Sequence, residues 1–224
     1  DNAATSFPKA PGVSERMRYY LDCVGASVNR GVYAPAQEAE LETLGLREKL
    51  CAFFHHPEPV RVLLTAGATA ALNLAIKGSL RPGSRVLVSA MEHNAVMRPL
   101  VQLGVDFTRV PCDATGRLDL DALERGLREK PEMLILNHAS NVSGTVQDAK
   151  MVGKLCKQYD VPFVLDAAQS AGHVPVDFAE FSLSALAVPA HKGLLGPQGI
   201  GALLVTQAFA AQLSPLIAGG TGSM

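Results

Sequence analysis

Residues 133–166 read MLILNHASNVSGTVQDAKMVGKLCKQYDVPFVLD. The two apolar runs, Met133–Asn137 and Val161–Asp166, predict buried strands. The stretch between them, Asp148–Tyr159, predicts a helix, because one apolar stripe recurs at helical spacing through Val152, Leu155, Cys156 and Tyr159. A strand, a helix and a second strand in this order are typical of a mainly parallel sheet with helices on its faces.

The same alternation extends outward over most of the chain. Five further strands are predicted at Val60–Thr65, Arg85–Ala90, Val105–Val110, Ala185–Val188 and Gly201–Val205. Four further helices are predicted at Ala36–Phe54, Ala68–Leu80, Asn94–Leu103 and Leu120–Glu129. The first 35 residues are spaced by Gly and Pro and are expected to be irregular. We therefore expect an α/β fold of three layers, αβα, around a mainly parallel, seven-stranded sheet.

The composition excludes several classes of protein. Among 224 residues, 48% are hydrophobic and 18% charged, the net charge is −1, and Lys and Arg are scattered, which argues against a nucleic-acid surface. No apolar stretch approaches the roughly 20 residues that cross a bilayer, and no signal peptide is recognisable, so we expect a cytoplasmic protein without membrane contact. The four cysteines lack metal-ligand or disulfide spacing and are expected to be reduced thiols, with no metal site.

Polar residues follow five of the predicted strands, at the carboxyl end of each. In open α/β sheets, ligands bind beyond these ends. The residues are Thr65 to Thr69, Glu92 and His93, His138 and Asn141, Asp166 and Gln169, and His191 and Lys192. We expect the five strand ends to converge on one pocket.

The stretch Leu64–Asn73, LTAGATAALN, joins a strand to a helix through one Gly and small residues. Such a helix start offers free backbone N–H groups to a phosphate, and Thr69 adds a hydroxyl. A capped helix after a tight turn is the alternative interpretation. The stretch contains neither the dinucleotide fingerprint G-x-G-x-x-G nor the G-x-x-x-x-G-K-[ST] loop of nucleoside triphosphate enzymes.

Asp166 and Lys192 are the candidates for reactive chemistry. Asp166 ends a strongly apolar strand, where a carboxylate needs a cationic or donor partner. A protonated pyridine nitrogen is one such partner, and a carboxylate that caps the next helix is the alternative. Lys192 lies between an apolar strand and a Gly-rich loop, where desolvation lowers the pKa of an amine and makes it nucleophilic toward an aldehyde. Most lysines are solvated surface groups, and the flanking sequence favours the reactive interpretation here.

These elements, in this order, resemble the class V aminotransferase family of fold-type I pyridoxal-5′-phosphate (PLP) enzymes, and within it the cysteine desulfurase and selenocysteine lyase group. The resemblance covers the whole chain, from Asp1-Asn2-Ala3-Ala4-Thr5 to Gly219–Ser223. The element His138–Gly144, HASNVSG, points most sharply to the desulfurase group. The other matching elements are Asn29–Gly31, Gly67–Thr69, Glu92–Asn94, Asp166–Gln169, His191–Lys192 and Gly196–Gly199.

The resemblance implies a role for each matching residue. Lys192 would form the Schiff base with PLP and then move the substrate α-proton, Asp166 would bind the ring nitrogen, and His93 would stack on the ring and assist proton transfer. Asn141 and Gln169 would lie near the phenolic oxygen. The phosphate would be held by Ala68, Thr69 and His191, with Thr221 reaching the phosphate of a neighbouring subunit's cofactor. The last contact implies a homodimer.

The resemblance also implies how the chain is divided and what it does. Residues 1–35 would line the active site, residues 36–224 would form the large PLP-binding domain, and a C-terminal small domain is expected beyond the final Gly-Gly-Thr-Gly-Ser-Met. The implied reaction converts L-cysteine to L-alanine and an enzyme-bound persulfide, or acts on selenocysteine, with a sulfur-acceptor protein as a further partner. The nucleophilic thiolate is expected beyond Met224, so we expect little turnover from these 224 residues alone.

Two departures from the family pattern concern the phosphate. Pro189 stands where many relatives have Ser or Thr, and Ala68 stands where many have a hydroxyl, so PLP could bind more weakly than usual. Two alternatives stay open: another class V reaction, such as transamination, β-elimination or epimerisation, and a non-catalytic scaffold that kept the fold. Pro189 slightly favours the scaffold, whereas the presence of Lys192, Asp166, His93 and Gln169 together argues strongly against it.

Overall fold

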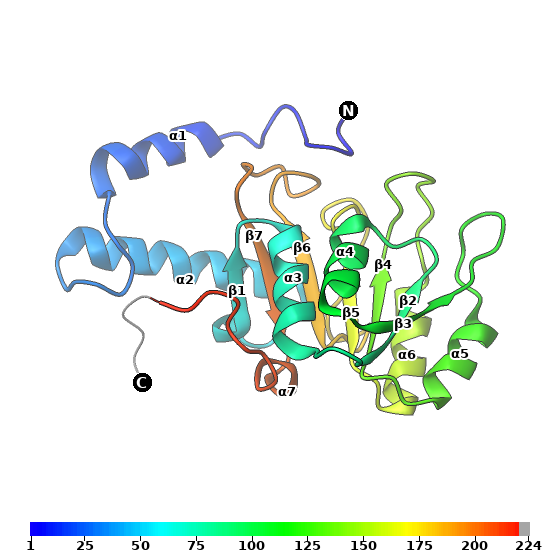
Figure 1. The fold of residues 1–224 in the computed structure, drawn as a ribbon. Helices are drawn as coiled ribbons and strands as arrows, with labels where there is room; N and C mark the ends of the chain where they lie inside the picture. Colours follow the sequence, from blue (N-terminus) through cyan, green and yellow to red (C-terminus); the bar gives the residue numbers. More distant parts are fainter. Residues whose placement is uncertain (220–224) are drawn as a thin grey trace.

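The computed structural model describes residues 1–219 and contains a seven-stranded sheet in the order β1-β7-β6-β5-β4-β2-β3 (Figure 1). β7 pairs antiparallel with β1 and β6, and the other pairs are parallel. The carboxyl ends of β1 to β6 therefore share one edge of the sheet. The strands are β1 Val62–Thr65, β2 Arg85–Ser89, β3 Asp106–Val110, β4 Met133–Asn137, β5 Phe163–Asp166, β6 Ala185–Pro189 and β7 Gly201–Val205.

Helices cover both faces of the sheet. Residues of α3 (Ala68–Ser79), α4 (Asn94–Leu103) and α7 (Gln207–Ala210) pack with one set of strand side chains in one core cluster. Residues of α5 (Leu120–Arg128), α6 (Ala149–Tyr159) and the carboxyl end of α2 (Ala34–Phe54) pack with the other set. The alternation of side chains along each strand separates the two sets. The predicted three-layer αβα fold with a mainly parallel, seven-stranded sheet is confirmed.

The predicted elements of residues 36–219 are confirmed, with no end shifted by more than two residues; the short helix α7 was not predicted. β1 and β5 each start two residues later than predicted, because Pro59–Arg61 forms a 3-10 turn and the backbone of Val161 bonds to the end of α6. α2 begins two residues earlier than predicted, with Pro35 in its first turn.

The N-terminal arm, residues 1–33, corrects one expectation. It contains a helix, α1 (Val13–Tyr19), followed by one π-helical turn, Tyr20–Val24, where an irregular segment was expected. α1 has no buried residue, so its sequence lacks the apolar periodicity on which that expectation depended. Figure 1 shows α1 and α2 extending to one side of the sheet, with the first residues returning above the sheet edge.

The centre of the sheet is the most tightly packed part of the molecule. Every residue of β4, β5, β6 and β7 is buried. Beside it, α6 approaches the segment before β6 closely: a Cβ added to Gly153 would lie 1.8 Å from the carbonyl oxygen of Phe181. Only glycine fits there without a shift of the backbone.

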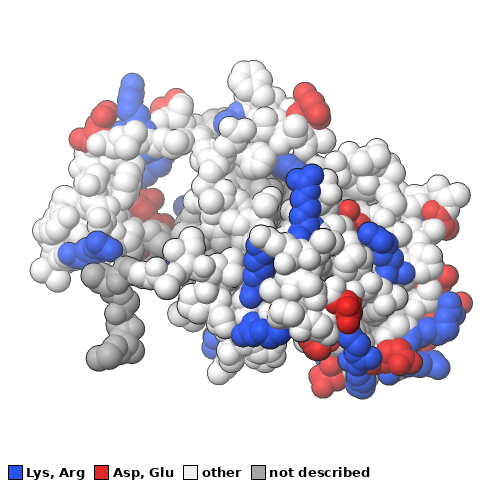
Figure 2. Space-filling view, viewed as in Figure 1, with Lys and Arg blue, Asp and Glu red and all other residues white. Residues whose placement is uncertain are grey.

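The surface carries both signs of charge. Figure 2 shows them most densely mixed over the end formed by α5 and α6, where Arg128 pairs with Glu124 at 3.1 Å and Lys150 pairs with Glu180. Within residues 1–219, no helix has the length and apolarity that a membrane crossing needs. The same residues contain no group of three or more His, Cys, Asp or Glu arranged to hold a metal ion.

Candidate active site

A cavity of about 410 Å³ lies at the carboxyl edge of the sheet. Residues following β1, β2, β4, β5 and β6 line it, so these strand ends do converge. Eight of the nine residues predicted to form the site are among them: Ala68, Thr69, His93, Asn141, Asp166, Gln169, His191 and Lys192. The ninth, Thr221, lies outside the described residues.

The start of α3 forms one wall of this cavity. Gly67 precedes it with φ 143°, and the first amide to close the helix is that of Ala71, which donates to the carbonyl of Gly67 at 3.0 Å. The amides of the three residues before Ala71 are thus left for a ligand. Gly201 at the start of β7 permits this turn, because a Cβ there would lie 2.7 Å from the Cα of Gly67.

Asp166 and Lys192 face the cavity from adjacent strand ends. Asp166 is 1% exposed, and its Oδ1 accepts a hydrogen bond from the amide of Ala168 at 2.9 Å. Burial raises the pKa of Asp166, while the Ala168 amide, His93 and Lys192 act in the opposite direction. Burial lowers the pKa of Lys192, and Asp166 opposes that shift. An amine with a lowered pKa has more of its nucleophilic neutral form near pH 7.

His93 and Gln169 are held in defined orientations. His93 caps α4, and its Nδ1 accepts the amide of Ala95 at 3.1 Å, so the proton of a neutral ring is on Nε2. Gln169 donates from Nε2 to the carbonyl of Ala3 at 3.0 Å, which leaves its second amide proton for a ligand. Asn141 is exposed and lines the cavity from the loop after β4.

His191 and Pro189 border the cavity at the end of β6. Nδ1 of His191 is buried without a hydrogen-bond partner in the described part of the chain. Its pKa is lowered, first by burial and then by the charges of Lys192 and Lys9. Pro189 has no hydroxyl to offer, as the sequence indicated.

Three polar residues expected in the pocket do not line it; Thr65 instead donates from Oγ1 to the carbonyl of Gly67 at 3.0 Å. The carboxyl of Glu92 is buried; its Oε1 accepts from Ser89 Oγ at 2.6 Å and from the amide of Asn137 at 2.8 Å, and burial raises its pKa to about 8. His138 is 3% exposed, packs edge-on to Phe181, and has its pKa lowered by burial to about 4. A residue's place after a strand does not fix the direction of its side chain, and this is why the expectation failed.

Asn137, the last residue of β4, lines the cavity although no role in the site was predicted for it from the sequence. Its Nδ2 donates to the carbonyl of Met91 at 3.2 Å. A polar side chain that ends an otherwise apolar run was the signal available in the sequence.

The donor set suits PLP. Free amides at the start of α3 and the unpartnered Nδ1 of His191 match a phosphate, the buried carboxylate of Asp166 matches a protonated ring nitrogen, and Lys192 matches an aldehyde. These groups border one cavity, so a single ligand can contact all of them.

Comparisons with known proteins agree with this geometry. A sequence profile of the family described as aminotransferase class-V matches residues 1–223. The cysteine desulfurase IscS of Vibrio atlanticus is 34% identical over 98% of this chain, and a probable cysteine desulfurase of Methanothermobacter thermautotrophicus is 32% identical over 98%. A solved apo cysteine desulfurase from Thermococcus onnurineus superposes on 98% of the chain with a TM-score of 0.90 and 30% identity. This chain spans 56% of the length of each of these three proteins.

Proposed function

The chain belongs to the aminotransferase class-V family, and on that basis we propose that it serves a PLP-dependent enzyme of the cysteine desulfurase type, which releases L-alanine from L-cysteine and passes the sulfur to an enzyme thiolate. One observation carries the proposal: Lys192 and Asp166 border the same cavity as the free helix start of α3. The similarity to proteins described as cysteine desulfurases supports the substrate.

When bound, PLP supplies an aldehyde and a protonated ring that withdraws electrons from a substrate carbanion. Asp166 would retain the proton on the ring nitrogen, because a buried carboxylate is stabilised by a cation beside it. Lys192 Nζ would hold the aldehyde carbon, and after substrate displaces it, take the proton from the substrate α-carbon. His93 would lie against the ring with its Nε2 proton, and His191 with the amides of Ala68 and Thr69 would bind the phosphate.

We propose that the thiolate that takes the sulfur belongs to a cysteine other than Cys51, Cys112 and Cys156, which are buried or half-buried in the domain. Burial raises the pKa of Cys51 and that of Cys112, and it raises the pKa of Cys156 to about 12. A raised pKa favours the thiol over the thiolate. None of the four cysteines lines the cavity that the structure describes. A nucleophile on another segment of the protein would have to reach the substrate.

The cofactor assignment can be tested by absorption and by mass. With PLP added, the wild type is expected to develop a visible band and, after borohydride reduction, a covalent adduct on Lys192; Lys192→Ala is expected to lose both. Lys154→Ala on α6 is the matched control, since Lys154 is exposed and does not line the cavity. An adduct of equal yield in Lys192→Ala would refute the proposal.

The substrate and reaction class need a second assay on the intact protein. With a thiol reductant added to release the persulfide sulfur as sulfide, alanine and sulfide in equal amounts from cysteine support desulfuration, and alanine from selenocysteine supports the lyase variant. Pyruvate with sulfide and ammonia supports β-elimination, and a keto acid that keeps the sulfur supports transamination. Pro189 is the observation that favours a scaffold, because it removes one phosphate ligand. A scaffold would give no Lys192-dependent band at any PLP concentration.

We also propose a homodimer, a sulfur-acceptor protein as partner, and a cytoplasmic location. Large apolar side chains exposed along the N-terminal arm support the dimer, since a second subunit would bury them; they are Phe7, Met17, Tyr19, Leu21, Val32 and Tyr33. The mass of the intact protein in sedimentation equilibrium tests it. The acceptor and the location are supported by the family and by the composition, respectively.

A further inference from the structure

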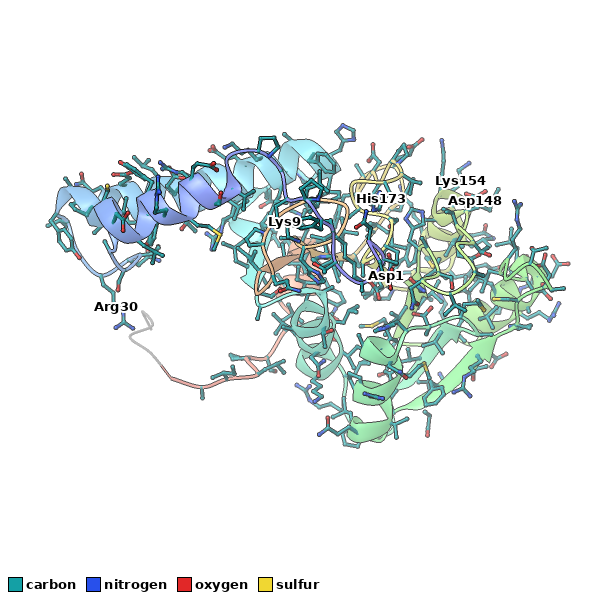
Figure 3. All side chains as sticks on the ribbon, turned by 90° about the horizontal axis from the view of Figure 1, so that it is seen from above. Asp1, Lys9, Arg30, Asp148, Lys154 and His173 are labelled. Atoms are coloured by element: carbon teal, nitrogen blue, oxygen red, sulfur yellow. The ribbon has the colours of Figure 1, made fainter. Side chains whose placement is uncertain are left out.

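Residues 3–10 form a strap that crosses the loop carrying Lys192. The amide of Ser6 donates to the carbonyl of His191 at 2.8 Å, and the amide of Ala10 donates to the carbonyl of Leu195 at 2.9 Å. Figure 3 shows this first segment running from α1 past Lys9 to Asp1, over the loops at the carboxyl edge of the sheet. The strap therefore meets the active-site loop at two points.

Lys9 is the charged residue of this strap. Its Nζ lies 3.2 Å from the carbonyl oxygen of His191, 3.2 Å from Thr5 Oγ1 and 3.4 Å from Ser6 Oγ. An ammonium has three protons, so these three acceptors use its full donor capacity. The side chain is half-buried, which strengthens such contacts relative to those of a solvated lysine.

The carbonyl of His191 collects an unusual number of donors. Besides Lys9 and the Ser6 amide, it is approached by Thr5 Oγ1 at 3.1 Å and by Ser6 Oγ at 3.0 Å. A carbonyl oxygen has two lone pairs, so four donors exceed what it can accept with good geometry. This oxygen belongs to the peptide bond whose nitrogen is that of Lys192, so the plane of that peptide fixes the nitrogen and Cα of Lys192, from which its side chain extends.

We propose that Lys9 is a positioning residue, whose ammonium fixes the 191–192 peptide and thereby aims Lys192 and the His191 ring into the cavity. The expected effect of Lys9 on the chemistry of Lys192 rests on the proposed function. The contacts of Lys9 that support the inference do not depend on a cofactor. A hydrogen bond to a charged donor is stronger than one between neutral groups, which is why a neutral residue at position 9 is not equivalent.

The test compares Lys9→Met, Lys9→Arg and the control Lys154→Met in the intact protein. Lys154 is exposed on α6, away from Lys9 (Figure 3). In protein freed of cofactor, amide exchange in residues 1–12 and 192–196 is measured by mass spectrometry. Lys9→Met is expected to speed exchange in both segments by about tenfold, since it removes one charged hydrogen bond. Lys9→Arg is expected to restore slow exchange, and Lys154→Met to change neither segment.

A second readout follows Lys192 itself. At saturating PLP, the rate at which the visible band grows is expected to fall about tenfold in Lys9→Met and to recover in Lys9→Arg, because misdirection of a nucleophile slows its capture of an aldehyde. Faster exchange confined to residues 1–12, with an unchanged rate of PLP capture by Lys192, would show that Lys9 holds only the N-terminal arm in place. That result would overturn the proposal. Unchanged exchange in both segments would overturn it too.

The two hypotheses fail separately. Absence of a Lys192-dependent band in the wild type would remove the proposed function. Exchange in residues 192–196 would then still decide whether Lys9 fixes the 191–192 peptide.

Discussion

The N-terminal arm and the central strands are held in place by different forces. In residues 1–33 only Ser6 and Val24 are buried, whereas every residue of β4 to β7 is. The strands gain stability from removing apolar surface from water. The arm contacts the loop carrying Lys192 through hydrogen bonds of Ser6, Lys9 and Ala10, and the carbonyl of Ala3 accepts a hydrogen bond from Gln169 after β5.

This difference separates folding from alignment. The sheet and its helices contain the residues that stabilise the domain and also the walls of the cavity. The arm adds little buried area, yet it contacts the carbonyl of His191 and the amide of Gln169, two residues that border the cavity. Changes in the strands should therefore alter stability, and changes in the arm should alter the site with little effect on stability.

The largest expected effect tests the packing beside the central strands. Gly153→Val should place its Cβ against the carbonyl of Phe181, and we expect a loss of at least about 4 kcal/mol in the free energy of unfolding. Gly45→Ala in α2 is the control, because no atom lies within 4 Å of the added Cβ, and Ala favours a helix by about 1 kcal/mol. Urea unfolding measures both. A Gly153→Val protein as stable as the wild type would contradict the close packing of α6.

A matched pair of leucines compares the two regions directly. Leu136→Ala in β4 should lose about 2–5 kcal/mol, because the fully buried side chain leaves a cavity. Measured at a concentration low enough to keep the protein monomeric, Leu21→Ala in the arm should change the free energy of unfolding by less than about 0.5 kcal/mol, since Leu21 is 76% exposed in the single chain. Both values come from urea unfolding at one pH. Equal losses would show that the arm is part of the cooperative core.

The smallest effect concerns pH and the buried carboxyl of Glu92. Its pKa is raised from 4.5 to about 8, so the folded protein binds this proton more tightly than the unfolded chain does. Stability from this group is full below pH 4.5 and is lost as the pH rises toward about 8. Glu92→Gln should match the wild type at pH 5 and be more stable at pH 9.

The urea midpoint at pH 5, 7 and 9 checks this sign. Asp166 is present in both proteins, but its charge is one of the causes that raise the pKa of Glu92, so the difference between the two proteins includes this repulsion. The same pH dependence in wild type and variant would mean that Glu92 is ionised in the folded protein.

The central strands could be predicted because a continuous apolar run indicates a strand that is buried on both of its faces. Met133–Asn137 and Gly201–Val205 were located to the residue. The cavity residues were found because they follow strand ends and match family motifs. The helix of the arm was missed, since α1 has no buried face to give its sequence a period.

Long-range contacts account for what the sequence could not reveal. Lys9 meets the carbonyl of a residue 182 positions away, and no local pattern encodes that meeting. Glu92 and His138 were expected in the pocket, and the way their side chains turn depends on neighbours from other segments, among them Asn137 and Phe181.

The position of β7 has a consequence for synthesis on the ribosome. Within residues 1–219, β1 pairs with β7 and with no other strand, and the register joins Val62 to Leu204. As the chain emerges from its N-terminus, β2 to β6 can pair in turn, whereas β1 has no strand to join until residue 205 has left the exit tunnel. The turn after β1, where the phosphate is proposed to bind, can thus join the sheet only once β7 has been made, and a nascent chain arrested before β7 would have Lys192 without the docked wall that faces it.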